Sequence, residues 1–295
     1  MVGTSAGGAV AVLYAAGFSF EQIRDVFRNT ALRRIAVIDP TRTGLIGQRK
    51  LTEYLTNLLG DRTFADLRIP CAVVATDLAS GQSVTINEGP LVPALLATAA
   101  IPSIVPPLVR DGMILADGGI VNNLPVDVAL QLGAEKVIAV DLADAAPGFQ
   151  LASADTSTPL ARLTLAPQQL AIANRALALL IAQTTRLYLE QYPPALLLRP
   201  DVDAISTLDL SNPEQGQAAG AAAALAAKDE LLALRAWRQN LPAEPPAPRQ
   251  PSFPRLPTIT LPAWAQQAAA DRFGWAPPDQ LRVAPDDEAE LGQVG

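Results

Sequence analysis

The sequence predicts an α/β fold with a mostly parallel sheet that helices cover on both faces. Apolar β-type runs alternate with helix-forming segments along the chain. The runs at residues 71–76 and 136–140 are continuously apolar, as in strands buried on both faces. Near the start, Gly3-Thr4-Ser5-Ala6-Gly7 fits G-x-S-x-G, the sharp turn that joins a strand to a helix.

Seven helices are expected, and residues typical of helix ends flank most of them. They lie at residues 9–16, 20–29, 51–59, 90–100, 125–133, 167–192 and 213–237. The first stops at Gly17, and Ser19-Phe-Glu-Gln22 opens the second as a capping box. The third is amphipathic and stops at Gly60. Ile101-Pro102 closes the fourth, and Pro125 suits the first turn of the fifth.

Strands are expected at residues 71–76, 83–86, 108–115, 136–140 and 195–199. A turn at Ser80-Gly81 joins the first two, and Asp111-Gly112 is a strong two-residue hairpin signal inside the third. Residues 37–49 and 143–157 are loop-like. Eleven of the 26 prolines fall within residues 241–295, so we expect a flexible tail there.

Composition excludes several classes of function. The 295 residues are 49% hydrophobic, which is enough for a large core. The net charge of −7 argues against a nucleic-acid partner. The chain has no histidine, which excludes a Ser-His-Asp triad and histidine-ligated metal sites. A serine nucleophile would therefore need a lysine or a carboxylate as its base, and no S-x-x-K spacing accompanies Ser5.

No stretch predicts a transmembrane helix, because the most apolar one, residues 170–181, is too short and carries Asn174 and Arg175. No signal peptide is visible. We expect a cytoplasmic protein with peripheral membrane contact, and the sequence does not predict an oligomeric state. Only two residues precede the G-x-S-x-G turn, so we expect the natural chain to begin upstream of Met1, where a targeting signal could also lie.

Ser5 and Asp117 are the candidate reactive residues. At the turn around Ser5, side chains at Gly3 or Gly7 are expected to collide with neighbouring backbone. The following helix would direct free N–H groups toward Ser5. Asp117 follows a predicted strand and precedes Gly118-Gly119. In open α/β sheets, functional residues gather where strands end.

Several segments, taken in order, resemble the bacterial branch of the patatin-like phospholipases. They are Gly3-Thr4-Ser5-Ala6-Gly7-Gly8, Val74-Ala75-Thr76-Asp77-Leu78, Ala100-Ile101-Pro102 with Pro106-Pro107, Asp117-Gly118-Gly119 with its continuation to Val126, and Val137-Ile138-Ala139-Val140-Asp141. The resemblance covers residues 1–235 and implies a three-layer α/β/α sandwich. We therefore expect a patatin-like domain over residues 1–235, followed by the tail.

The resemblance implies a Ser–Asp dyad that hydrolyses lipid acyl esters, with Ser5 as nucleophile and Asp117 as general base. Gly3, Thr4, Ala6, Gly7, Gly118 and Gly119 complete the two motifs, and no metal or cofactor is implied. Family members carry a glycine-rich oxyanion loop upstream of the serine, and this sequence contains none. Two alternatives therefore stay open. One is a catalytically inert lipid-binding or scaffold protein of the same fold, and the other is an esterase for nonlipid substrates.

Other polar residues are expected to be structural. Asp77 and Asp141 end strands and should organise local turns. Asn122 and Asn123 should form turn and helix-start hydrogen bonds. Arg42, Arg49 and Lys50 are expected on a solvated face, although they could meet a phospholipid head group. Cys71 lies in an apolar run and should be a buried, inert thiol.

Overall fold

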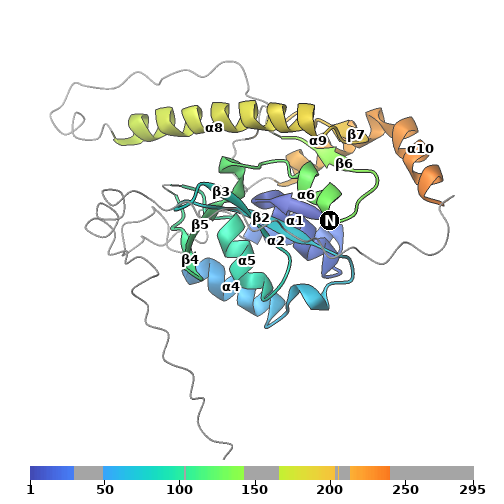
Figure 1. The fold of residues 1–295 in the computed structure, drawn as a ribbon. Helices are drawn as coiled ribbons and strands as arrows, with labels where there is room; N and C mark the ends of the chain where they lie inside the picture. Colours follow the sequence, from blue (N-terminus) through green and yellow to red (C-terminus); the bar gives the residue numbers. More distant parts are fainter. Residues whose placement is uncertain (30–48, 103, 143–165, 203–204, 206–212, 240–295) are drawn as a thin grey trace, which may run out of the picture. The chain divides into compact units, whose positions relative to one another are not determined.

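The computed structural model describes residues 1–29, 49–102, 104–142, 166–202, 205 and 213–239 (Figure 1). The loop expected at 143–157, the predicted tail at 241–295, and most of the loop expected at 37–49, with Arg42, lie outside the described residues.

A mixed sheet forms around one fully buried strand, β2 (Ala72–Asp77). The other strands of this sheet are β1 (Val2–Thr4), β3 (Gln82–Ile86), β4 (Leu108–Arg110) and β5 (Met113–Asp117). β1 runs parallel to β2, whereas β3 and β5 run antiparallel to it, and β4 pairs with β5 as a hairpin. The predicted α/β class is confirmed. Parallel pairing, expected for most of the sheet, is limited among the described strands to β1–β2 and to a separate pair, β6 (Ile138–Val140) with β7 (Leu196–Leu198).

β1 and β5 share one edge of β2, and this arrangement positions the site. β1 pairs with the first half of β2 and ends where Thr4 lies opposite Val74. β5 pairs with the second half in the opposite direction and ends where Asp117 lies opposite Ala75. The two strands therefore run toward each other along the same edge. Their last residues lie opposite consecutive residues of β2.

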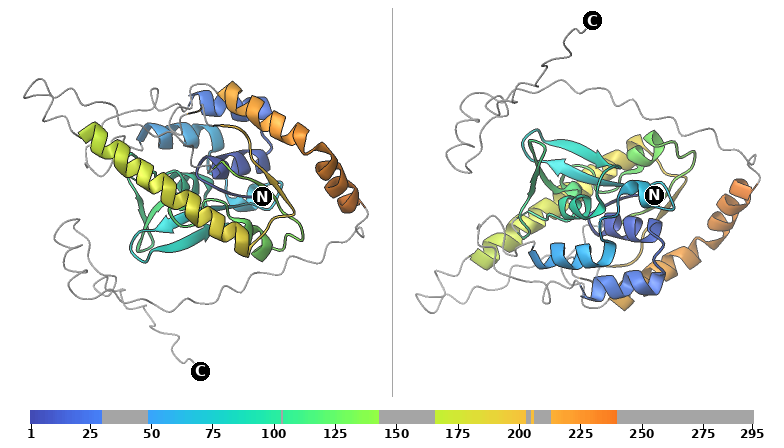
Figure 2. Two further views of the ribbon diagram at one scale, coloured as in Figure 1. Left: turned by 90° about the horizontal axis from the view of Figure 1, so that it is seen from above. Right: turned by 90° about the horizontal axis from the view of Figure 1, so that it is seen from below.

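Helices pack against the sheet and build the main core (Figures 1 and 2). They are α1 (Ala6–Ala15), α2 (Phe20–Asn29), α4 (Arg49–Leu59) and α5 (Leu91–Thr98). The core side chains come from all four helices and from β2 and include Val12, Leu13, Ile23, Leu55, Leu59, Val73, Leu91 and Leu95. Burial of these apolar side chains holds α1 and α5 against β2.

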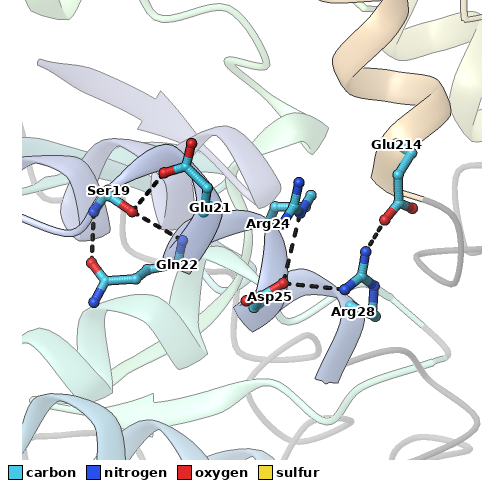
Figure 3. Close-up of polar contacts among 7 residues, drawn as sticks. All are labelled: Ser19, Glu21, Gln22, Arg24, Asp25, Arg28 and Glu214. Atoms are coloured by element: carbon cyan, nitrogen blue, oxygen red, sulfur yellow. Dashed lines mark hydrogen bonds and ion pairs between the residues drawn. The ribbon is translucent and has the colours of Figure 1, made fainter.

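The local signals in the sequence correspond to real helix ends and turns. The Ser19 amide donates to the Gln22 side chain at 2.8 Å, and the Gln22 amide donates back to the Ser19 hydroxyl at 3.3 Å (Figure 3). This reciprocal pair is the predicted capping box. Asp111 and Gly112 both have positive φ, 52° and 76°, as a two-residue hairpin turn between β4 and β5 requires.

The later part of the chain departs from the predictions in two places. The predicted last helix is two helices, α9 (Pro213–Ala226) and α10 (Lys228–Gln239). β6 was expected to be buried on both faces, but Ile138 and Val140 are about half exposed. Ile138 and Val140 share one face of β6 and Ala139 lies on the other, so only the Ala139 face of this strand is buried. The helices α6 (Val126–Gln131) and α8 (Ala166–Gln191) form close to their predicted positions.

An ion pair links α2 to α9. The guanidinium of Arg28 contacts both Asp25, one turn earlier in α2, and Glu214 at the start of α9 (Figure 3). These side chains are 40–52% exposed, so the contacts lie at the protein surface. Within the described residues, no helix combines the length and the apolar character that a membrane span needs.

Candidate active site

The turn after β1 holds Ser5 in a strained backbone conformation. Ser5 has φ 54° and ψ −127°, a combination that residues with a side chain rarely adopt. Gly3 permits the turn, because a Cβ at this position would lie 2.3 Å from the carbonyl oxygen of Gly7. The half-buried side chain of Ser5 therefore sits on a sharp bend between β1 and α1.

The prediction that both flanking glycines avoid collisions is wrong for one of them. A Cβ built on Gly7 meets nothing within 4 Å. Gly8 is the tightly packed glycine, since its Cβ would lie 3.1 Å from the Gly3 carbonyl oxygen and 3.2 Å from the Val73 side chain. The difference arises because Gly7 is on the exposed face of α1 and Gly8 faces the sheet.

The backbone of Ser5 is bound to a residue that the sequence reasoning missed. The Ser5 amide donates to the hydroxyl of Thr98 at 2.8 Å, and that hydroxyl donates to the carbonyl of Val74 at 2.6 Å. Thr98 is the last residue of α5 and is fully buried. A usable signal existed, because Thr98 is the one polar side chain in the otherwise apolar segment Leu91–Thr98.

Asp117 ends β5 and is almost buried, with 8% of its surface exposed. Its amide donates to the Ala100 carbonyl at 2.9 Å, and its Oδ1 accepts from the Gly119 amide at 2.8 Å. Gly118 allows the chain to leave the sheet here. A Cβ at this position would lie 2.3 Å from the Val74 carbonyl oxygen and 3.0 Å from the Thr4 side chain.

The structure brings the two predicted residues together, although they lie 112 positions apart in the chain. Because β1 and β5 approach each other along β2, Ser5 and Asp117 emerge at the same point of the sheet. The Ser5 side chain lies close enough to the Asp117 carboxyl to stabilise its ionised form. This contact is the one that a nucleophile and its base require.

Burial raises the pKa of the Asp117 carboxyl above its ordinary value of about 4. The neighbouring Ser5 side chain and the hydrogen bond from the Gly119 amide lower this pKa, because both stabilise the ionised form. Desolvation is the larger effect. The carboxylate is therefore a stronger base than a solvated aspartate, and the Ser5 hydroxyl lies beside it as the group that gives up a proton.

The other candidates have structural contacts. The carboxylate of Asp77 accepts from the amides of Ala79, Ser80 and Ile114 and from the Ser80 hydroxyl, which ties the β2–β3 turn to β5. Asp141 pairs with Arg199 at 3.4 Å, between β6 and β7.

Asn122 makes the turn and helix-start contacts predicted for it. Its amide donates to the Gly118 carbonyl at 2.8 Å, and its side chain donates to Asp127 in the first turn of α6 at 2.8 Å. Its own carbonyl accepts from the Thr4 hydroxyl at 2.9 Å, which joins β1 to the segment after Asp117.

The structure also describes Arg49, Lys50 and Cys71, which the sequence analysis singled out. Arg49 is exposed and pairs with Glu53 one turn later, and Lys50 is exposed. Burial raises the pKa of the Cys71 thiol to about 11, so this thiol is protonated at neutral pH. The part of the chain that the structure describes contains no group of three His, Cys, Asp or Glu side chains that could hold a metal ion.

Comparison with known proteins finds similarity over the first part of the chain. Residues 1–130 match the model of the patatin-like phospholipases. A protein of Mycobacterium bovis named as an uncharacterized NTE family protein is 35% identical over 147 residues, which is 48% of this chain and 40% of that protein. Patatin-like phospholipase domain-containing protein 7 of Rattus norvegicus and protein 6 of Homo sapiens are 31% and 30% identical over 148 residues.

These matches cover a limited part of the relatives. The chain spans less than half the length of the mycobacterial protein, and it covers 11% of the rat and human proteins. The family match ends at residue 130, whereas the resemblance seen in the sequence was expected to extend to residue 235. Both Ser5 and Asp117 lie inside the matched region.

Proposed function

We propose that this chain hydrolyses acyl esters of lipids through Ser5 and Asp117, because residues 1–130 match the family model of the patatin-like phospholipases. The observation that carries the proposal is that the ends of β1 and β5 meet along β2 and bring the Ser5 side chain beside the buried Asp117 carboxyl. This arrangement places a hydroxyl on a strained turn beside a base of raised pKa.

The reaction follows from this pair of groups. Asp117 accepts the proton of the Ser5 hydroxyl while Ser5 Oγ forms a bond to the ester carbonyl carbon. The C–O bond to the alcohol then breaks, and Asp117 returns the proton to the leaving oxygen. Water then gives a proton to Asp117 while its oxygen bonds to the acyl carbon. The bond between that carbon and Ser5 Oγ breaks, Asp117 returns the proton to Ser5 Oγ, and the fatty acid leaves. No metal takes part in these steps.

The start of α1 offers hydrogen-bond donors for the oxyanion. The helical hydrogen bonds begin with the Ala9 amide, which donates to the Ser5 carbonyl at 3.1 Å. The amides of Ala6, Gly7 and Gly8 therefore have no acceptor inside the helix. The Ser5 amide is occupied by Thr98, so the donors available at this turn start with Ala6. Partial positive charge at a helix N-terminus favours a developing negative charge.

A phospholipid or lysophospholipid is the proposed substrate. The names of the rat and human relatives include phospholipase domains, and the site contains a nucleophile with a carboxylate base. Cleavage of an acyl ester needs no further reactive group. Peripheral contact with a membrane surface would deliver such substrates.

The test is covalent labelling by a fluorophosphonate probe, read by intact-protein mass spectrometry. We expect one adduct on Ser5, none in Ser5→Ala, and strongly slowed labelling in Asp117→Asn. Ser83→Ala is the matched control, because the Ser83 hydroxyl is buried without a hydrogen-bond partner and its removal breaks no contact. It should label like the unaltered protein.

A folded protein that does not label at Ser5 contradicts the proposal and favours an inert lipid-binding protein. If Ser5 is labelled, a series of p-nitrophenyl esters from two to sixteen carbons separates the remaining alternatives. Rates that increase with chain length support a lipid substrate, and a preference for the shortest esters supports a nonlipid esterase.

A further inference from the structure

We propose that Thr98 is a positioning residue that fixes the backbone of Ser5 and keeps its hydroxyl within reach of Asp117. The inference rests on the proposed function, since it assigns a task within the same site. Its basis is a set of hydrogen bonds that converge on the C-terminal end of α5, in the best-buried part of the molecule.

The contacts of the Thr98 hydroxyl determine where its proton lies. A hydroxyl has one proton to donate and lone pairs with which to accept. The Val74 carbonyl, 2.6 Å away, can only accept, so it takes that proton. The lone pairs then accept from the Ser5 amide at 2.8 Å. Thr98 is 0% exposed, so solvent does not reach the hydroxyl to replace either bond.

The end of α5 holds both reactive residues at once. Thr98 binds the amide of Ser5 through its side chain, and Ala100, two residues later, binds the amide of Asp117 through its carbonyl. A short, nearly rigid stretch of chain therefore sets the separation between the nucleophile and the base. Of these two contacts, only the one from Thr98 depends on a side chain and can be removed by substitution.

Val74 connects this support to the sheet. Its carbonyl accepts from Thr98, and the same carbonyl is the atom that a Cβ at Gly118 would strike. Val74 also lies opposite Thr4 in the ladder between β1 and β2. The hydroxyl thus joins the end of β1, the middle of β2 and the end of α5 at the point where Ser5 adopts its positive φ.

The hydrogen bond to Thr98 affects the position of the Ser5 hydroxyl relative to Asp117. Without the hydroxyl, the Ser5 amide loses its partner and the turn can relax toward a commoner backbone conformation. The Ser5 hydroxyl would then spend less time aligned with Asp117. Small misplacements of reacting groups can lower rates by up to about 100-fold. The chemical step should therefore suffer more than substrate binding.

The experiment compares three variants of the full chain. Thr98→Val keeps the shape and removes the hydroxyl, and Thr98→Ser keeps the hydroxyl. Thr76→Val is the matched control, because Thr76 is equally buried on β2 and its hydroxyl has no hydrogen-bond partner. We measure the rate constant for fluorophosphonate labelling of Ser5, kcat and KM with a p-nitrophenyl ester, and hydrogen exchange of the Ser5 amide.

We expect Thr98→Val to lower kcat and the labelling rate roughly 10- to 100-fold, with KM within about twofold of the unaltered protein. Thr98→Ser should restore both rates to within about threefold, and Thr76→Val should not change them. The Ser5 amide should exchange faster in Thr98→Val alone. Restoration by serine separates positioning from a general loss of packing, because serine lacks the methyl group that packing would need.

Unchanged labelling in Thr98→Val together with a still-protected Ser5 amide overturns the inference and leaves the proposed function standing. Should Thr98→Val fail to fold, Thr98→Cys makes the same comparison with a weaker hydrogen-bonding group, and a rate equal to that of the unaltered protein overturns the inference. If the unaltered protein does not label at all, the proposed function fails. In that case, hydrogen exchange of the Ser5 amide still tests whether Thr98 fixes the backbone of Ser5, by comparison of Thr98→Val with the unaltered protein.

Discussion

The ends of β1 and β5 supply the two reactive groups, and they carry different kinds of cost. At the end of β1, Ser5 is half-buried and its backbone has a rare positive φ. At the end of β5, Asp117 has an ordinary extended backbone, with φ −51° and ψ 129°, but its carboxyl is buried and its pKa is raised. The backbone strain at Ser5 and the loss of solvation at the Asp117 carboxyl both destabilise the folded state.

The same two ends have one requirement in common. Each needs a glycine where another stretch of backbone approaches, with a Cβ at Gly3 or at Gly118 placed 2.3 Å from a carbonyl oxygen. The glycines are therefore needed wherever two stretches of backbone come close, whereas the positive φ of Ser5 and the burial of Asp117 belong to the two reactive groups.

Asp117→Asn should have the largest effect on activity. Without a base, we expect the labelling rate of Ser5 to fall by roughly 10²- to 10⁴-fold. An amide oxygen can still accept from the Gly119 amide, so the fold should be kept. The rate constants for labelling of the variant and the unaltered protein give the measurement.

The same variant should gain stability at neutral pH. The pKa of Asp117 is raised in the folded protein, so the folded state retains its proton to higher pH than the unfolded state. The unaltered protein therefore loses stability as the pH increases through the folded pKa, and Asp117→Asn does not. Melting temperatures should differ at pH 7 and converge below about pH 4. A variant that melts lower at pH 7 would contradict this account of the β5 end.

Replacing a glycine at a close backbone approach with alanine should have the next largest effect, on the free energy of unfolding. Gly118→Ala forces a backbone shift and should destabilise the fold by about 1–3 kcal/mol or more. Gly7→Ala is the matched control inside the G-x-S-x-G turn. It meets open space and should be neutral or stabilising by up to about 1 kcal/mol, as for alanine in a helix. Urea unfolding of both variants provides the comparison, and equal losses would refute it.

The pH profile of labelling should also distinguish the two ends. The rate should increase about tenfold per pH unit while Asp117 is protonated, and level off above its pKa. Since burial raises that pKa, the midpoint should lie above the value of about 4 for an ordinary aspartate. Thr98→Val should lower the plateau. Circular dichroism at each pH verifies that the protein stays folded.

The smallest effect is expected away from both strand ends. Glu214→Gln removes the partly exposed partner of Arg28 and should change the free energy of unfolding by less than about 1 kcal/mol. Labelling of Ser5 should be unchanged. A marked loss of labelling would contradict this expectation, because it would show that the ion pair between α2 and α9 affects the reactivity of Ser5.

The local features of this protein can be predicted from its sequence alone. The Ser19–Gln22 capping box, the Asp111-Gly112 turn and the fully buried run at β2 all occur where their residues indicate. Each depends on a few neighbouring residues, so a pattern in the chain is sufficient to predict it. The motifs around Ser5 and Asp117 were recognised in the same way, through their glycines and through resemblance to a family.

How these local elements combine depends on the tertiary structure. The approach of β1 and β5 along one edge of β2 depends on strand pairing between distant segments, as does the mixed direction of the sheet. The bond from Ser5 to Thr98 joins residues 93 positions apart, and the open space at Gly7 depends on which side of α1 faces the sheet. A residue such as Thr98 can stand out in the sequence as the one polar side chain of an apolar helix. Its partner cannot be identified from the sequence, because the packing of the whole domain decides which groups meet.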